Sequence, residues 1–282
     1  MKKFLSFMLL CTTLLVSGCD NSDNENKPDK YEDKITIGLM TCMNASEETY
    51  DKFMLKLEDT FKVKMTSHKT IFFDNLTAML TALQSRQIEE ICTYKSVARY
   101  IRNENPKYTV LENHSVEFVD SFCFALRKDD KKLRKEFDEA LAKLKMDGTL
   151  DNLVDKYITN VDLTNGIPKT ELAHIEGADT IKVAVTGDLP PMDYVTAEGH
   201  ADGFNVALLG EIGKIIGKNF KLIHMDSGAR AYALQSKYVD VVFWAIMPVD
   251  EIFPENLDKS EEIILTAPYY QDKTVHMIFD DK

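Results

Sequence analysis

Positive charge is scarce in this sequence, as are glycine, proline and tryptophan. Lys and Arg number 34 against 46 Asp and Glu, which gives a net charge of -12 at pH 7. Nucleic acid is therefore an unsuitable partner, because proteins neutralise phosphates with Lys and Arg. Hydrophobic residues make up 44% of the 282 residues. This is enough to bury the core of one large domain or of two small ones.

Long apolar runs are also missing after the first few residues. Met1–Lys3 carries positive charge, and the apolar run from Phe4 to Val16 is too short to span a bilayer comfortably. Residues 1–18 therefore fit a secretory signal peptide. The ending Ser-Gly-Cys19 resembles a bacterial lipoprotein signal, which implies acylation of Cys19 and attachment to a membrane outside the cytoplasm. In an ordinary secreted protein, Cys19 would be incidental.

Residues 19–33 are polar and acidic, which predicts a disordered tether. Cys42, Cys92 and Cys123 follow it. Either Cys92 and Cys123 form a disulfide, or all three are separate buried thiols. Neither the cysteines nor the six histidines have metal-site spacing, and no phosphate loop or nucleophile elbow occurs. No metal or cofactor is expected.

Strand and helix patterns alternate along the rest of the chain. Strands are expected at residues 34–40, 63–73, 88–94, 108–111, 118–127, 180–185, 220–224, 239–244, 263–270 and 274–279. Helices are expected at residues 46–61, 95–103, 131–145, 149–157, 203–217 and 227–236, and one capped by Asp74 runs to about residue 83. Residues 159–178 form the interior linker, because their periodicity is weak and they contain Gly166 and Pro168.

One local pattern occurs in both halves. "ALQSRQIEEI" ends one expected helix and "ALQSKYVDVV" ends another, and in each an acidic residue then enters an apolar strand. The repeat predicts two α/β lobes with mostly parallel, covered sheets. Ligands of such sheets bind at the carboxyl ends of the strands, so two facing lobes predict a cleft that closes on a small molecule.

The residues resemble the bacterial extracellular solute-binding proteins, family 3, the polar amino-acid-binding type of ABC importers. The runs "VAVTGDLPPMDYV", "GFNVALLGEIGKIIGKN" and "APYYQDKTVHMIF" are similar to the family's first lobe, and residues 179–282 supply it with the crossover strand. Residues 34–127 resemble the second lobe. The run "DGTLDNLVDKYI" resembles the terminal helix pair, at residues 128–158, which in the family packs on the first lobe.

In the family the first lobe comes first along the chain, whereas here it comes last. The resemblance therefore implies a circular permutation, with the former ends joined by the linker. This change is physically easy when termini lie close together at the surface. Two degenerate tandem copies are the alternative.

The resemblance places the ligand-binding residues but not the family's charged anchors. An Arg that holds the ligand α-carboxylate corresponds to Ile252, and Met247 replaces a Thr before it. Tyr94 lies near the position of the acidic residue that takes the α-ammonium. A preference for α-amino acids is therefore not implied.

Other residues at the expected cleft are candidates for ligand contact. They are Asp188, Met192, Tyr194, Asp226, Ser227, Arg230, Trp244, Thr41, Asn44, Thr93 and Tyr94. Arg230, at a helix start, either holds an anion or is a surface residue. Trp244 either stacks on a ring or cation of the ligand or packs between lobes. Ser46 is expected to cap a helix.

The main functional hypothesis is a monomeric, lipid-anchored solute-binding protein that delivers a small molecule to the permease of an ABC importer. The second is an enzyme on the same fold, such as a dehydratase, for which Asp188 or Asp226 needs a perturbed pKa. The third is a lobe pair without a ligand that docks a partner protein.

Overall fold

The structure is a computed structural model that describes residues 35–44, 46–62, 68–111, 118–247, 258 and 260–281. The chain divides into Met1–Asp33 and one compact unit, Lys34–Lys282. The expected signal peptide, the lipidation site Cys19 and the tether lie outside the described residues. None of the described helices has both the length and the apolar character needed to cross a membrane.

The N-terminal lobe, residues 35–111, alternates strands with helices. Its elements are β1 (Ile35–Met40), α1 (Glu47–Phe61), β2 (His68–Phe73), α2 (Leu76–Gln84), β3 (Glu90–Tyr94), α3 (Lys95–Glu104) and β4 (Tyr108–Val110). Strand β5 (Val119–Arg127) then leads into α4 (Lys131–Met146) and α5 (Thr149–Val154), which ends in a π-helical turn, Asp155–Thr159. A single 3-10 turn, Leu163–Asn165, begins the linker.

The C-terminal lobe combines β5, α4 and α5 with strands from the second half of the chain. Its later elements are β6 (Thr180–Val185), β7 (Tyr194–Val195), β8 (Ala201–Asp202), α6 (Phe204–Ile216), β9 (Asn219–His224), a 3-10 turn (Ser227–Ala229), α7 (Arg230–Gln235), β10 (Val241–Ile246) and β11 (Ile263–Leu265). The last strand, β12 (Tyr270–Phe279), returns to the N-terminal lobe.

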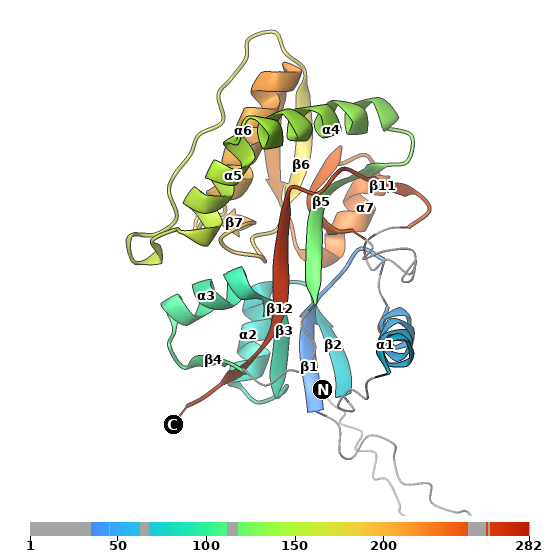
Figure 1. Cartoon of the computed structure of the whole chain (residues 1–282), viewed down its shortest axis with the longest axis vertical. Helices are drawn as coiled ribbons and strands as arrows, with labels where there is room; N and C mark the ends of the chain where they lie inside the picture. The colour runs from blue at the N-terminus through green and yellow to red at the C-terminus, as the bar shows by residue number, and fades with distance from the viewer. Residues whose placement is uncertain are drawn as a thin grey trace, which may run out of the picture. The chain divides into compact units, whose positions relative to one another are not determined.

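Each lobe has a parallel core, and two long strands connect the lobes. The strand order is β2-β1-β3-β12-β5-β10-β6-β9. The pairs β1–β2, β1–β3, β10–β6 and β6–β9 are parallel, whereas β5 and β12 pair antiparallel with their neighbours. The start of β12 pairs with β5 and its end with β3 and β4, so the strand passes from one lobe to the other (Figure 1). This confirms the two-lobed α/β fold.

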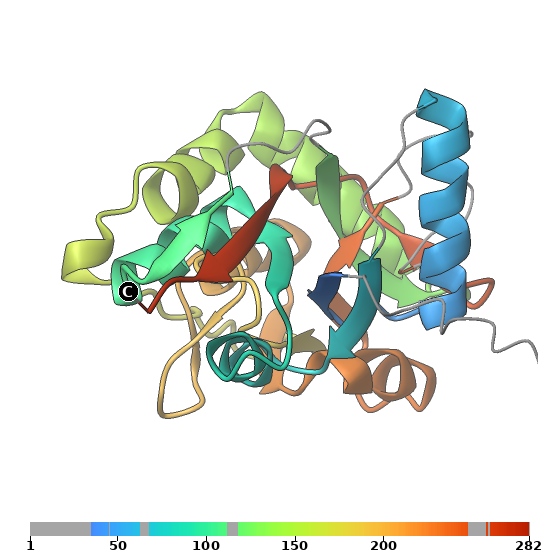
Figure 2. The ribbon, with the colours of Figure 1, turned by 90° about the horizontal axis from the view of Figure 1, so that it is seen from below.

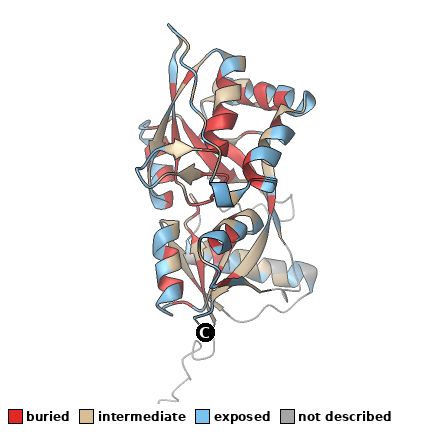
Figure 3. Cartoon of the chain, turned by 90° about the vertical axis from the view of Figure 1, so that its left-hand side faces the viewer, coloured by how far each residue is buried: buried red, intermediate tan, exposed pale blue. Residues whose placement is uncertain are grey.

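Apolar faces bury the sheet of the C-terminal lobe on both sides. Phe124, Phe137, Phe204 and Phe243 are fully buried in one cluster with α4 and α6. A smaller cluster under α7 includes Cys123, Ala184, Leu234 and Val242. Buried residues line these strands and the inner sides of the helices (Figure 3). In the N-terminal lobe, α1 lies beside β2 at the sheet edge, where Tyr50 contacts Phe72 edge-on (Figure 2).

The repeated corner has the same geometry in both lobes. Arg86 and Lys237 adopt the left-handed conformation, with φ of 60° and 61°. The next residue donates its N–H to a carbonyl in the last helical turn, Gln87 to Ala82 at 2.9 Å and Tyr238 to Ala233 at 3.0 Å. These bonds satisfy helix-end carbonyls and turn the chain, as in a Schellman motif.

The acidic residue after each corner ties the chain to the first strand of its lobe. Glu89 donates its N–H to Thr36 O at 3.0 Å and accepts the N–H of Thr36 on its carboxylate at 2.7 Å. Asp240 makes the same two bonds with Lys182, at 2.8 and 3.0 Å. The shared sequence pattern thus encodes a shared strand entry.

Three local predictions need correction. Asn75 rather than Asp74 caps α2, because its side chain accepts the N–H of Ala78 at 2.9 Å. The expected strand at 239–244 lies at Val241–Ile246, because the corner bonds occupy residues 238 and 239. The strand expected at 263–270 is not continuous, because β11 covers only Ile263–Leu265 and Tyr270 already begins β12, which includes the strand expected at 274–279. The short hairpin of β7 and β8 was not predicted, since two-residue strands leave no periodic pattern. Ser46 does cap α1, accepting the N–H of Thr49.

Candidate functional site

Polar groups from both lobes meet where β1, β2, β6 and β9 end. The N-terminal lobe contributes Thr41 after β1, Asp74 after β2 and Leu76 at the start of α2. The C-terminal lobe contributes Asp188 after β6, and Ser227 and Arg230 around the start of α7. We call these six residues the interlobe polar cluster. Their direct hydrogen bonds bring the lobes together at the carboxyl ends of the parallel strands, where α/β sheets bind ligands.

Asp188 connects the C-terminal lobe to the start of α2. One carboxylate oxygen accepts the N–H of Leu76 at 2.9 Å, and the other accepts the Ser227 hydroxyl at 2.5 Å. The side chain is only 3% exposed. Burial raises the pKa of Asp188 to about 6, although the bonds from Ser227 and Leu76 act to lower it. The carboxyl therefore changes charge just below neutral pH.

Arg230 is buried completely and stacks on Trp244. Its guanidinium carbon lies 3.7 Å from the centre of the indole ring, and both residues are at most 2% exposed. It donates to the carbonyl oxygens of Ser227, Trp244 and Thr41, at 3.0, 2.9 and 2.8 Å. The interpretation of Arg230 as a surface residue is therefore wrong. The Trp244 ring stacks on a cation, which the protein itself supplies.

The sheet places Trp244 in this position through an irregularity in β10. The register against β5 shifts between Val242 and Ala245. As a result, the consecutive residues Phe243 and Trp244 both join the larger core cluster, whereas Val242 and Ala245 join the smaller one. A bulge of this kind redirects a side chain toward a site.

Asp258 is a second buried carboxylate beside Arg230. It accepts the N–H of Met43 from the N-terminal lobe at 2.6 Å and that of Ile246 from β10 at 2.7 Å. Its Oδ1 lies 3.9 Å from the Nη2 of Arg230, and both side chains are fully buried. Asp258 thus partly balances the guanidinium charge and adds another bond between lobes.

Asp74 brings the two backbones into very close contact. The N–H of Ser227 donates to Asp74 O at 2.7 Å, and Thr41 donates its hydroxyl to the Asp74 carboxylate at 2.9 Å. A Cβ added at Gly228 would lie 2.3 Å from that carboxylate. A side chain at 228 would therefore displace the Asp74 carboxylate from this position.

A buried network supports the cluster from the C-terminal lobe. Thr186 accepts the indole N–H of Trp244 at 3.0 Å and donates its hydroxyl to Asp193 at 2.8 Å. Asn205 donates to the other oxygen of Asp193 at 3.1 Å. Thr186 Oγ1 also accepts the N–H of Asp188 at 3.2 Å. These bonds fix the positions of Trp244 and Asp188.

Tyr94 ends β3 and contacts the connecting strand β5 rather than the interlobe polar cluster. It donates its hydroxyl to Asp120 of β5 at 2.7 Å, and its ring meets Phe122 edge-on. Burial raises the pKa of Asp120 to about 6, which the bond from Tyr94 opposes. Thr93 is buried, with 4% exposure.

Four further predicted residues lie apart from the interlobe polar cluster. Met192 is 1% exposed and belongs to the hydrophobic core. Tyr194 lies in β7, with its ring 6.2 Å from that of Tyr100 in α3. Asp226 and Asn44 are exposed. The segment containing Ile252, the position of the family's Arg, lies outside the described residues.

Sequence reasoning missed Asp74 and Leu76 as cleft residues, and also Asp120 and Asp258. The position of Asp74 directly after a strand was a usable signal, because loops at carboxyl ends of strands carry ligand-binding groups. Leu76 contributes only its backbone N–H, which its side chain could not reveal.

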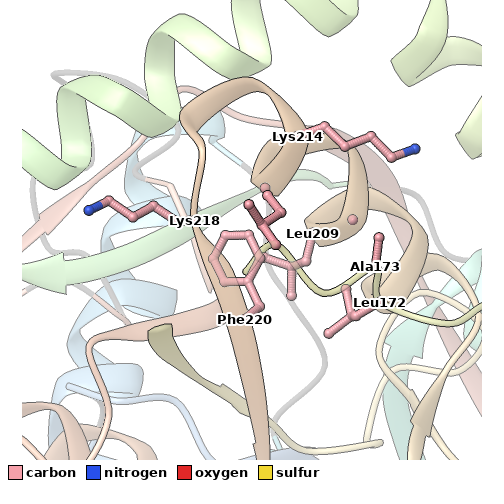
Figure 4. Close-up of a pocket in the computed structure, with 9 residues that line it drawn as sticks. Leu172, Ala173, Leu209, Lys214, Lys218 and Phe220 are labelled. Carbon is pink, nitrogen blue, oxygen red and sulfur yellow. The ribbon is translucent and has the colours of Figure 1, made fainter. Parts of the chain in front are cut away.

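Free thiols and a small hollow lie outside the interlobe polar cluster in the described residues. Cys42, Cys92 and Cys123 are all free, so the Cys92–Cys123 disulfide is not formed. No group of His, Cys, Asp and Glu in the described ranges is arranged to hold a metal ion. A shallow hollow between the linker and α6 is lined mainly by apolar residues, and Lys214 and Lys218 point away from it (Figure 4).

Two α/β lobes joined by paired strands, with polar groups meeting between them, define the class of two-lobed binding proteins. The sequence profile of the bacterial extracellular solute-binding proteins, family 3, matches residues 33–160 and 181–281. The chain belongs to this family, whose members bind solutes outside the cytoplasm.

Solved structures with a similar fold share little sequence with this chain. A ligand-binding component of an ABC-type import system from Staphylococcus aureus, with zinc bound, is 12% identical, with a TM-score of 0.41; the match covers 87% of this chain and 65% of that one. The GluR0 ligand-binding core in complex with L-glutamate is 10% identical, with a TM-score of 0.41 and coverage of 88% and 86%.

A nutrient-binding protein from Burkholderia cenocepacia bound to methionine is 11% identical, with a TM-score of 0.39 and coverage of 87% and 84%. No curated protein matches the chain. The ligand of this protein therefore has to be argued from its own residues.

Proposed function

We propose that the protein captures a small molecule between its lobes and delivers it to the permease of an ABC importer, while a lipid on Cys19 anchors it to the membrane outside the cytoplasm. Membership of the solute-binding family is the observation that carries this proposal. The polar groups between the lobes support it, because ligand sites of such proteins combine a few convergent polar groups with aromatic side chains. On this proposal the protein acts as a monomer and catalyses no reaction.

The ligand is expected to displace bonds that the protein makes with itself. Arg230 and Asp188 are the buried charged members of the interlobe polar cluster. Protein groups already occupy three guanidinium N–H donors and both carboxylate oxygens. A small molecule with complementary donors and acceptors would replace some of these bonds. Asp188 and Arg230 together suit a ligand that carries both hydrogen-bond donors and hydrogen-bond acceptors.

A thermal-shift screen of the purified protein tests this proposal. The panel of compounds contains amino acids, polyamines, nucleosides, sugars and organic acids. A specific ligand at about 100 times its Kd should stabilise the protein by roughly 2.7 kcal/mol. A hit that is recovered chemically unchanged supports a binding protein. A hit that is consumed supports the dehydratase-like alternative, for which the raised pKa of Asp188 is the motivating observation.

The interlobe polar cluster also favours a third function, because its polar groups already bond to one another. If protein groups permanently satisfy Arg230 and Asp188, the lobe pair needs no ligand and instead docks a partner protein. This hypothesis predicts that the protein is well folded and that no compound in the panel stabilises it.

We also infer that the chain is a circular permutation of one family member. Each element of a two-lobed binding protein occurs about once, which two tandem copies would not give. The start of β1 and the end of β12 lie at the same end of the sheet, with β3 between them. Two strand spacings separate them laterally by about 10 Å. Short connections of this kind permit permutation.

A reordered chain tests the permutation. It starts at Asp179, joins Asp281 to Lys34 through a short Gly/Ser linker, and ends at Asn160. We expect it to fold cooperatively with the same far-UV spectrum and with a stability close to that of the natural order. A reordered chain that remains unfolded while the natural order folds would favour the tandem-copy origin.

A further inference from the structure

A Cys, a His and a Glu meet on one face of the N-terminal lobe, outside the interlobe polar cluster. Cys92 in β3 lies directly opposite His276 in β12. Glu90 precedes Cys92 by two residues, so both side chains lie on the same face of the sheet. The Nδ1 of His276 lies 2.9 Å from the Glu90 carboxylate, and Cys92 is the cross-strand neighbour of the same histidine. Residues 186 positions apart are thus aligned by strand pairing.

Cys92 is the most accessible of the three described cysteines. It is partly exposed, whereas Cys42 is 8% exposed and Cys123 is fully buried. The side chain of His276 is 24% exposed and that of Glu90 is 13% exposed. All three residues are therefore partly exposed to solvent.

The three groups have the roles found around reactive thiols. A thiolate is the nucleophilic form of cysteine, and an adjacent imidazolium stabilises it. The Glu90 carboxylate at Nδ1 orients the imidazole and favours its charged form. Burial acts to lower the pKa of His276, but the neighbouring Cys92 and Glu90 outweigh this effect and raise the pKa to about 10. His276 therefore carries a proton at neutral pH.

We propose that Cys92, His276 and Glu90 form a thiol-exchange site that takes low-molecular-weight disulfides. The Cys92 thiolate attacks one sulfur of the disulfide, a new S–S bond forms, and the original S–S bond breaks. The departing thiolate accepts a proton from the His276 imidazolium, so one small thiol leaves and a mixed disulfide remains on Cys92. The small disulfide is the oxidant. Glu90 is a positioning residue, because it acts through the imidazole.

An oxidising location outside the cytoplasm supports this substrate class, because small disulfides persist there. The location rests on the family to which the chain belongs. The site does not depend on the proposed solute ligand. Its test can therefore fail or succeed independently of the ligand screen.

The test uses the purified, reduced protein and bis(2-hydroxyethyl) disulfide, a small neutral probe. Intact-mass and peptide mass spectrometry follow the adduct on each cysteine. We expect one adduct on Cys92, forming at least about tenfold faster than on the same cysteine in urea-unfolded protein, since general acid–base assistance contributes about 10²–10⁴-fold. Cys92→Ser should abolish the adduct.

Three variants test the roles of the neighbours. His276→Ala should slow adduct formation at least about tenfold, and added imidazole should restore part of the rate. Glu90→Gln should slow it less and change the ¹⁵N chemical shifts of the His276 ring. Glu89→Gln is the matched control, because it makes the same charge change at the preceding, exposed residue; its rate should stay unchanged.

Two results would overturn the proposal. One is an unchanged rate in a folded His276→Ala variant. The other is slower reaction of Cys92 in the folded protein than in the unfolded one. If His276→Ala does not fold, the comparison of folded with unfolded wild type decides alone.

Discussion

Replacing Arg230 by Met is expected to destabilise the protein by about 3–5 kcal/mol, the usual effect of breaking a buried charged pair. The guanidinium is fully buried, and its loss leaves the carbonyls of Ser227, Trp244 and Thr41 without these donors. Asp258, fully buried 3.9 Å away, loses the neighbouring positive charge. Methionine supplies an apolar chain but none of these bonds. Urea unfolding measures the difference.

Two further variants make the Arg230 prediction specific. Arg230→Lys retains the charge but lacks the planar fork, so we expect an intermediate loss. Arg86→Met is the control, because Arg86 is largely exposed and only pairs with Asp281 at the surface. Its effect should stay within about 0.5 kcal/mol. A loss below about 1 kcal/mol for Arg230→Met would contradict the stabilising role of the buried guanidinium.

The free energy of unfolding should fall as the pH rises from about 4 to about 6. Burial raises the pKa of Asp188 and of Asp120 to about 6 in the folded protein, whereas an unfolded Asp titrates near 3.9. The folded state therefore binds more protons between these values, and stability decreases with pH in that window. Each of the two carboxyl groups lowers the free energy of unfolding by roughly 2–3 kcal/mol across this window, because its pKa differs by about two units between the folded and unfolded states and each unit corresponds to 1.36 kcal/mol.

Asp188→Asn isolates one of these contributions. The variant cannot ionise, so we expect it to gain stability relative to wild type between pH 4 and pH 7, and the gain should level off above pH 6. Asp226→Asn is the matched control, because Asp226 is exposed on the segment next to Ser227. Unfolding free energies from urea titrations at several pH values provide the measurement. A difference between Asp188→Asn and wild type that does not vary with pH would contradict the assignment.

Most elements of the fold were predictable from sequence because their patterns are local. Apolar periodicity gave the strand–helix alternation of both lobes, and the Ala-Leu-Gln-Ser-basic corners marked two equivalent helix ends. The cap of α2 was misassigned because Asp74 and Asn75 are both good capping residues, and only the backbone decides between them. The passage of β12 between lobes depends on its pairing with β5, β3 and β4, which no single segment encodes.

The site was predicted less completely, because its contacts link distant residues. Asp188, Ser227, Arg230 and Thr41 were named in advance and do meet. The stack of Arg230 on Trp244 depends on the bulge in β10, which sequence did not indicate. Met192 was misplaced because a methionine near a turn serves a core as readily as a ligand site.

The hydrogen bonds between the lobes affect how the protein would bind a ligand. In the described structure, Asp188 and Arg230 connect the lobes directly. A ligand has to exchange these bonds for its own, so its affinity reflects the difference between two sets of contacts. The lobes must separate for this exchange to occur. Gly228 lies against the Asp74 carboxylate of the other lobe, so a substitution at Gly228 tests this separation of the lobes most directly.

Calorimetric titration of a ligand from the screen into wild type and Gly228→Ala tests most directly whether a small molecule is held between the lobes. A Cβ at 228 would lie 2.3 Å from the Asp74 carboxylate, whereas a Cβ at Gly210 would meet Leu172 at an ordinary 3.8 Å. We predict one bound ligand per chain and unchanged binding to Gly210→Ala. Binding to Gly228→Ala should be tighter by about tenfold, or 1.4 kcal/mol, because the substitution weakens a contact that the ligand has to break. Equal affinity for all three proteins, or no ligand from any class in the panel, would contradict capture between the lobes.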